Sequence, residues 1–176
     1  MTNTKQVVNV GIMVGLLILA SQISFKLGPI PITAQTLMIM VIATLMRVKE
    51  SVVVGLVYLL MGAIGLPVFA SLNGGLAYLL GPTGGFLISF PIMLGLISYT
   101  LSFNSSWYFK VLSYILATAV CYLIGVKYFM LSTSYSLAES LNLCVYPFIL
   151  GDLLKIGCAV VCTERLTQIN FIFRKN

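Results

Sequence analysis

The longest stretch of this chain without a charged residue runs from Ser51 to Phe109, and it constrains the fold more than any other feature. A stretch of this length holds two membrane-spanning helices of about 20 residues each and a connection between them. The rest of the chain has the same character, because 60% of all residues are hydrophobic and 8% are charged. An average soluble domain has roughly 25% charged residues. We therefore expect an all-α polytopic membrane protein.

The 176 residues leave room for about six spans and for no separate soluble domain, so residues 1–176 are expected to form a single transmembrane domain. The six predicted transmembrane helices cover about residues 6–25, 33–47, 51–66, 84–101, 107–130 and 147–167. The segment 131–146 mixes polar and apolar residues and is expected to lie along the membrane interface. With the N-terminus in the cytoplasm, most Lys and Arg residues fall on the cytoplasmic side. The positive-inside rule therefore favours six spans with the N- and C-termini both cytoplasmic.

The connection between the third and fourth predicted helices, from Gly65 to Gly85, is rich in glycine and contains Pro67 and Pro82. Glycine and proline favour backbone conformations outside a helix, and such backbone is tolerated near a membrane where it is buried in protein or lines a cavity. The stretch is therefore either the wall of a cavity or an ordinary loop. The first turn of the second predicted helix carries polar residues, which either cap that helix or face the same cavity.

Two charged residues, Asp152 and Lys155, lie well inside the apolar run of the last predicted helix. A charge within a span costs roughly 2.5 to 3.5 kcal/mol even on lenient scales, so such residues are usually retained for function. Their spacing of three places them on one helix face, where they either neutralise each other or bind a solute. We favour a binding role, in a pocket that opens to the outer side and also uses the glycine-rich stretch.

Gly11 and Gly15 form a G-x-x-x-G pattern in the first predicted helix. Small residues at this spacing let two membrane helices approach closely. The partner is either another helix of this chain or a separate membrane protein.

Several classes of function have no support in the sequence. It contains no P-loop, no His with which its four cysteines would complete a metal set, and no nucleophile–base pair, so we expect no catalysis, metal or cofactor in this chain. The net charge of +6 comes from basic residues scattered singly, which argues against nucleic acid. A membrane enzyme acting on a lipid would need an acid-rich metal motif that is absent from the sequence. What remains is a membrane protein that holds a small, mostly apolar solute with a few polar groups.

Four short motifs narrow this class further. They are PITAQT at 31–36, GLPVFA at 65–70, LLGPTGGFL at 79–87 and GDLLK at 151–155. In their order and spacing they closely resemble the BioY family, the biotin-specific substrate-binding (S) components of energy-coupling factor (ECF) transporters. The resemblance covers about residues 6–168.

The resemblance implies a six-helix protein of the cytoplasmic membrane that holds biotin near the outer face, beneath a lid formed by the loop before the second helix. It also implies docking to a transmembrane coupling subunit and two ATPase subunits, with Gly11 and Gly15 at the position of the docking face. The motif positions that match the family give the candidate biotin contacts Gln35, Asn73, Asp152 and Lys155. Aromatic residues near the expected pocket, on which the biotin ring would rest, are Tyr78, Phe86 and Tyr146.

The chemistry of biotin allows roles to be assigned as hypotheses. Asp152 accepts hydrogen bonds from the ureido N–H groups, and Asn73 completes the polar contacts around the ureido group. Lys155 either balances Asp152 or contacts the valerate carboxylate. The alternative function is a stand-alone secondary transporter of biotin or another small vitamin, coupled to protons or sodium through Asp152.

Overall fold

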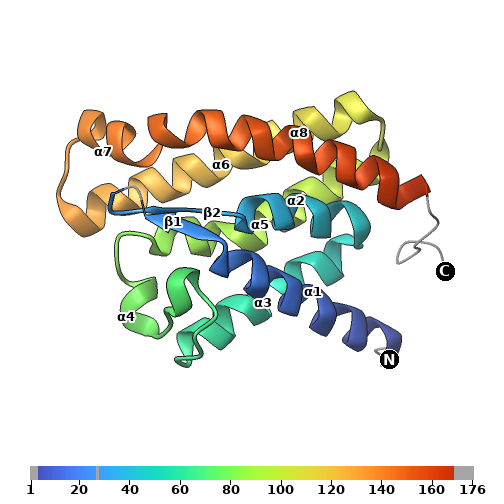
Figure 1. Ribbon diagram of the computed structural model, residues 1–176, viewed down its shortest axis with the longest axis horizontal. Helices are drawn as coiled ribbons and strands as arrows, with labels where there is room; N and C mark the ends of the chain where they lie inside the picture. Colours follow the sequence, from blue (N-terminus) through green and yellow to red (C-terminus); the bar gives the residue numbers. More distant parts are fainter. Residues whose placement is uncertain (1–3, 27, 169–176) are drawn as a thin grey trace.

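The structure is a computed structural model that describes residues 4–26 and 28–168, and this part of the chain is helical apart from two short strands. Its elements in chain order are α1 (Thr4–Gln22), β1 (Ser24–Lys26), β2 (Pro31–Thr33), α2 (Gln35–Leu45), α3 (Val48–Ala63), the 3-10 helix η1 (Ala70–Leu72), α4 (Leu76–Leu79), α5 (Gly84–Phe103), α6 (Trp107–Thr133), α7 (Leu137–Cys144) and α8 (Tyr146–Gln168). The long helices pack side by side as one bundle (Figure 1). The expectation of an α-helical fold is confirmed.

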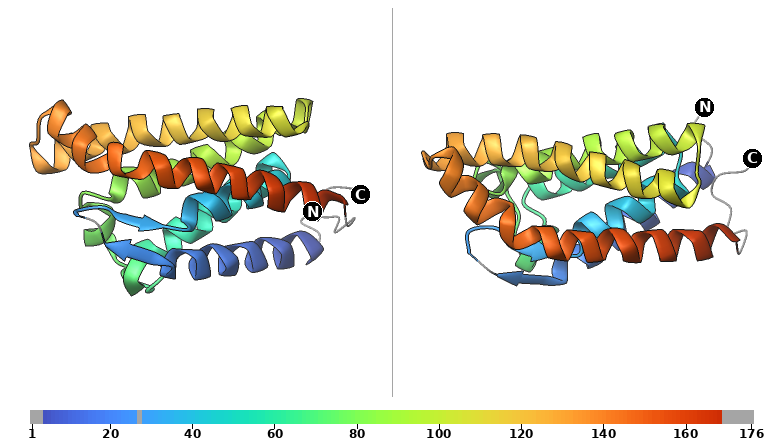
Figure 2. Two further views of the ribbon diagram at one scale, coloured as in Figure 1. Left: turned by 45° about the horizontal axis from the view of Figure 1, so that its top comes forward. Right: turned by 90° about the horizontal axis from the view of Figure 1, so that it is seen from above.

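Four helices of the described residues, α1, α5, α6 and α8, are long and apolar enough to cross a membrane. Helix α2 is apolar but has only 11 residues, and α3 has 16. The start of α1 and the end of α8 lie at one end of the bundle, which we call the terminal end (Figure 2). The strands, α4 and α7 lie at the opposite end, which we call the hairpin end. The chain is therefore a multi-pass membrane protein.

The largest departure from the predicted elements lies between the first two helices. The first helix was predicted to continue to Phe25, and this is wrong: α1 ends at Gln22, because the next residues form β1 and pair with β2. Ser24 lies opposite Thr33 in this antiparallel hairpin. Gly28 lies between the two strands and takes a φ of 102°, which favours glycine. Helix α2 consequently starts two residues later than predicted.

An aromatic cluster forms the centre of the core at the hairpin end. The ring of Tyr58 on α3 lies 5.4 Å from that of Phe69 and 6.4 Å from that of Phe90, measured between centroids. Phe69 in turn stacks on Tyr78, at 5.5 Å. A Cβ atom on Gly62 would lie 1.9 Å from the Phe69 ring, so glycine lets this ring pack directly on α3. The cluster thereby anchors the glycine-rich stretch to the bundle.

Gly11 and Gly15 face open space in the direction in which a side chain would point. A Cβ atom added to either one would meet no other atom within 4 Å. Helix α1 also leaves large apolar side chains exposed around them, including Ile12, which is 50% exposed. Of the two interpretations of the G-x-x-x-G pattern, packing against another described helix of this chain is therefore wrong.

Candidate binding pocket

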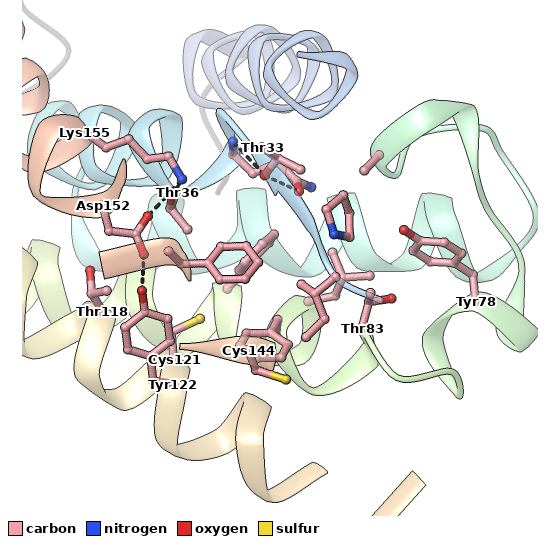
Figure 3. A pocket seen from close by; sticks show the side chains of 18 residues that line it. Thr33, Thr36, Tyr78, Thr83, Thr118, Cys121, Tyr122, Cys144, Asp152 and Lys155 are labelled. Atoms are coloured by element: carbon pink, nitrogen blue, oxygen red, sulfur yellow. Dashed lines mark hydrogen bonds and ion pairs between the residues drawn. The ribbon is translucent and has the colours of Figure 1, made fainter. Parts of the chain in front are cut away.

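A pocket lies at the hairpin end, between α2, α5, α6, α8 and the glycine-rich stretch, and its lining is shown in Figure 3. It has a volume of about 640 Å³, counted with its open mouth. Most of the wall is apolar, with Ile30, Phe86, Leu87, Phe90 and Phe148 among its residues. A solute with a bulky apolar ring system would therefore find apolar contacts along most of the wall.

The polar part of the wall is centred on Asp152 of α8, whose side chain is 9% exposed. Lys155, one turn later, donates from Nζ to Asp152 Oδ1 at 2.8 Å and to Thr36 Oγ1 of α2 at 3.2 Å. The Tyr122 hydroxyl of α6 donates to the other carboxylate oxygen, Oδ2 (Figure 3). Both carboxylate oxygens therefore accept a hydrogen bond from the protein. Each oxygen has further acceptor capacity that N–H groups of a solute could use.

Gln35 also lines the pocket, but both ends of its amide already contact the protein. Its Nε2 donates to the Tyr58 hydroxyl at 2.5 Å, and its Oε1 accepts from the Thr33 hydroxyl at 2.9 Å. The Tyr58 hydroxyl donates onward to the backbone oxygen of Val68 at 3.0 Å. Gln35 thus ties α2 to α3 and to the glycine-rich stretch. Gln35 lies in the pocket wall and holds that wall in place, and its contact with biotin stays a prediction.

The glycine-rich stretch is the wall of a cavity rather than an ordinary loop, because Ala70, Tyr78 and Thr83 from it line the pocket. Gly75 has a φ of 93° and donates its backbone N–H to Gly62 at 2.7 Å. Burial raises the pKa of Tyr78 above its ordinary value, against the opposing effect of a hydrogen bond with Thr83. Tyr78 therefore presents a neutral hydroxyl to the pocket.

Two of the predicted site residues lie outside the pocket. The Asn73 side chain donates from Nδ2 to the backbone oxygen of Ala70 at 2.7 Å, so it shapes the loop that carries a pocket residue. Tyr146, at the start of α8, is 60% exposed. The other predicted residues, Gln35, Tyr78, Phe86, Asp152 and Lys155, are brought together in the pocket wall.

Sequence reasoning missed Tyr122 and Thr118, which line the pocket from α6. Both lie in a long apolar helix, where single threonines and tyrosines are common. The available signal was their spacing, because residues at i and i+4 share a helix face. A polar pair on one face of a span points to a polar neighbour, which here is Asp152.

The chain is similar to proteins with known names along nearly its whole length. A biotin transporter BioY from Thermotoga maritima is 30% identical over 166 residues, covering 94% of this chain and 97% of the relative. A probable biotin transporter BioY from Pyrococcus horikoshii is 34% identical over 162 residues, covering 92% of this chain and 96% of the relative. None of these names describes an enzyme.

The fold is likewise similar to a solved structure. The crystal structure of the S-component for biotin from an ECF-type ABC transporter matches with a TM-score of 0.87 and 28% identity. The match covers 96% of this chain and 95% of the other. Residues 1–170 also match the BioY family as a whole. The chain belongs to the BioY family.

Proposed function

We propose that this chain is the biotin-binding S component of an ECF transporter and takes up biotin across the cytoplasmic membrane. The names of its relatives and of its structural neighbour support this function. The observation that carries the proposal is the Asp152–Lys155 ion pair in the wall of an otherwise apolar pocket. Such a pocket matches a solute with an apolar ring and a small polar group that donates and accepts hydrogen bonds.

The proposed topology has six crossings, with α2 and α3 as the two shorter ones and both termini in the cytoplasm. In support, the start of α1 and the end of α8 share the terminal end (Figure 2). Lys110 also belongs to that end, since it forms an ion pair with Glu164 near the end of α8 at 2.6 Å. Basic residues at this end satisfy the positive-inside rule when it faces the cytoplasm. The pocket then opens toward the outer side, and the whole chain acts as one domain.

Within the pocket, we assign the ureido group of biotin to the end formed by Asp152 and Lys155. The Asp152 carboxylate accepts from a ureido N–H group, while Lys155 donates to Oδ1 of the same carboxylate. The fused ring lies against Phe86 and Tyr78 in the apolar wall. Asn73 acts indirectly, through the loop that it stabilises.

ATP hydrolysis is assigned to partner subunits, namely two ATPases that act through a transmembrane coupling subunit. The exposed face of α1 around Gly11 and Gly15 is the proposed docking surface for the coupling subunit. Its support is that a Cβ atom added to either glycine would meet no other atom of the described residues within 4 Å. A close helix–helix contact needs small residues of this kind.

The test is a titration of the purified, detergent-solubilised protein with biotin after removal of any co-purified ligand. Thiamine and riboflavin serve as controls. Saturable binding of biotin alone is expected. A folded sample that does not bind biotin would refute the proposal.

A second experiment separates the proposed mechanism from a stand-alone secondary transporter. Biotin uptake is measured in cells whose partner ATPase is inactivated, with and without an ionophore. Uptake that collapses with the ATPase supports the S-component function. Uptake that persists and is abolished by the ionophore would instead support ion-coupled transport.

A further inference from the structure

Thr118 of α6 carries a buried hydroxyl that the pocket leaves unused. The residue is 7% exposed, and its Oγ1 has no hydrogen-bond partner among the residues that the structure describes. A buried hydroxyl without a partner is unfavourable, so nearly all such groups in folded proteins are paired. This one therefore points to a partner supplied by another molecule.

The lack of an internal partner sets Thr118 apart from other helical threonines of this chain. A threonine within a helix usually bonds back to the carbonyl oxygen four residues earlier. Thr44 does so with Met40 at 2.8 Å, and Thr133 does so with Phe129 at 2.6 Å. No such bond satisfies Thr118. The hydrogen-bonding capacity of its hydroxyl is consequently not used within the part of the chain that the structure describes.

The position of Thr118 identifies the part of a solute that it would meet. It lines the pocket one helical turn before Tyr122, and Figure 3 shows it on the side of the pocket that holds Asp152 and Tyr122. The same three side chains also line a second pocket, between α6 and α8. Thr118 therefore belongs to the polar end of the pocket, next to the carboxylate assigned to a ureido N–H group.

We propose that the Thr118 hydroxyl donates a hydrogen bond to the ureido oxygen of bound biotin and contributes to specificity for that group. The inference rests on the proposed function. An ionised carboxylate only accepts hydrogen bonds, so Asp152 can recognise a ureido N–H group but not the ureido oxygen. In the cyclic ureido group the two N–H groups lie on opposite sides of this oxygen, so a carboxylate that accepts from one of them has the donor to the oxygen beside it. Thr118 provides a hydroxyl at that place.

The test compares Thr118→Val, which keeps the shape but removes the hydroxyl, with Thr118→Ser, which keeps the hydroxyl. We expect Thr118→Val to weaken biotin binding by roughly five- to fiftyfold, and Thr118→Ser to stay within about threefold of wild type. The thermal stability of the protein without biotin is measured in parallel. It should not fall in Thr118→Val, because a methyl group replaces an unpaired hydroxyl.

The contacted atom is identified with 2-iminobiotin, in which an imino group replaces the ureido oxygen. Wild type should bind it more weakly than biotin, and Thr118→Val should lower its affinity little further. If Thr118→Val lowered the affinities for biotin and for 2-iminobiotin by the same factor, the assignment of the contact to the ureido oxygen would be overturned. Unchanged biotin affinity in Thr118→Val would overturn the contact itself. Wild-type protein that does not bind biotin would instead refute the proposed function, so the two failures are distinguishable.

Discussion

The Asp152–Lys155 pair allows stability and binding to be separated in one set of variants. Asp152→Asn keeps the shape of the side chain but leaves the Lys155 ammonium, which is 16% exposed, without its counter-ion. Breaking a buried ion pair costs about 3 to 5 kcal/mol, and we expect about 3 kcal/mol because Lys155 keeps some exposure and its contact with Thr36. For a chain of this size, that corresponds to a fall in melting temperature of roughly 6 to 12 °C.

The double variant Asp152→Asn/Lys155→Met removes the uncompensated charge as well. Its melting temperature should return close to the wild-type value, because a buried pair can be replaced by groups without charge at little cost. Biotin binding should not recover. Loss of charge-assisted hydrogen bonds, worth about 1.5 to 3 kcal/mol, predicts an affinity ten- to a hundredfold below wild type in both variants.

The matched control is Glu164→Gln, which breaks the ion pair with Lys110 at the terminal end. It is expected to lower the melting temperature without changing biotin affinity. Thermal unfolding in detergent and biotin titration are measured for all four proteins. A double variant no more stable than Asp152→Asn would refute the coupling of the two charges, and wild-type affinity in Asp152→Asn would remove that residue from the site.

Two further predictions use glycines. In Gly125→Ala the new Cβ would lie 2.3 Å from the Phe86 ring, which must then shift in the pocket, so biotin affinity should fall by about tenfold or more. Gly157→Ala, where nothing lies within 4 Å, is the control, and equal affinities of the two variants in a biotin titration would contradict the prediction. The double variant Gly11→Leu/Gly15→Leu should keep full biotin affinity but no longer co-purify with the coupling subunit and ATPases, whereas intact co-purification would exclude α1 as the docking face.

The charged residues of the site could be predicted because their cost in a membrane is large. Asp152 and Lys155 stand out in an apolar run, and the structure places both in the pocket wall. Thr118 and Tyr122 could not be identified in the same way, since a single hydroxyl group in a membrane helix costs little free energy and is therefore common. Their importance follows from a carboxylate on another helix, and only the packing of α6 against α8 brings them to it.

The side-chain direction of Asn73 could not be predicted, because it depends on local backbone geometry. Ser71 and Leu72 both have positive φ values, 57° and 58°, which non-glycine residues seldom adopt. This turn directs the Asn73 amide back to the oxygen of Ala70 rather than into the pocket. A motif match gives the residue type at a position, but it does not give these angles.

The two non-helical segments at the hairpin end show why the pocket lies where it does. Backbone that leaves a helix near a membrane must find other hydrogen-bond partners. Between α1 and α2 a two-stranded ladder supplies them, extended by the Ala34 N–H bonded to Ile23 at 3.0 Å. Between α3 and α5 the Gly75 N–H bonds to Gly62, the residue on which Phe69 packs. Because β2 extends to Thr33, α2 begins only at Gln35, and this first residue of the helix lines the pocket.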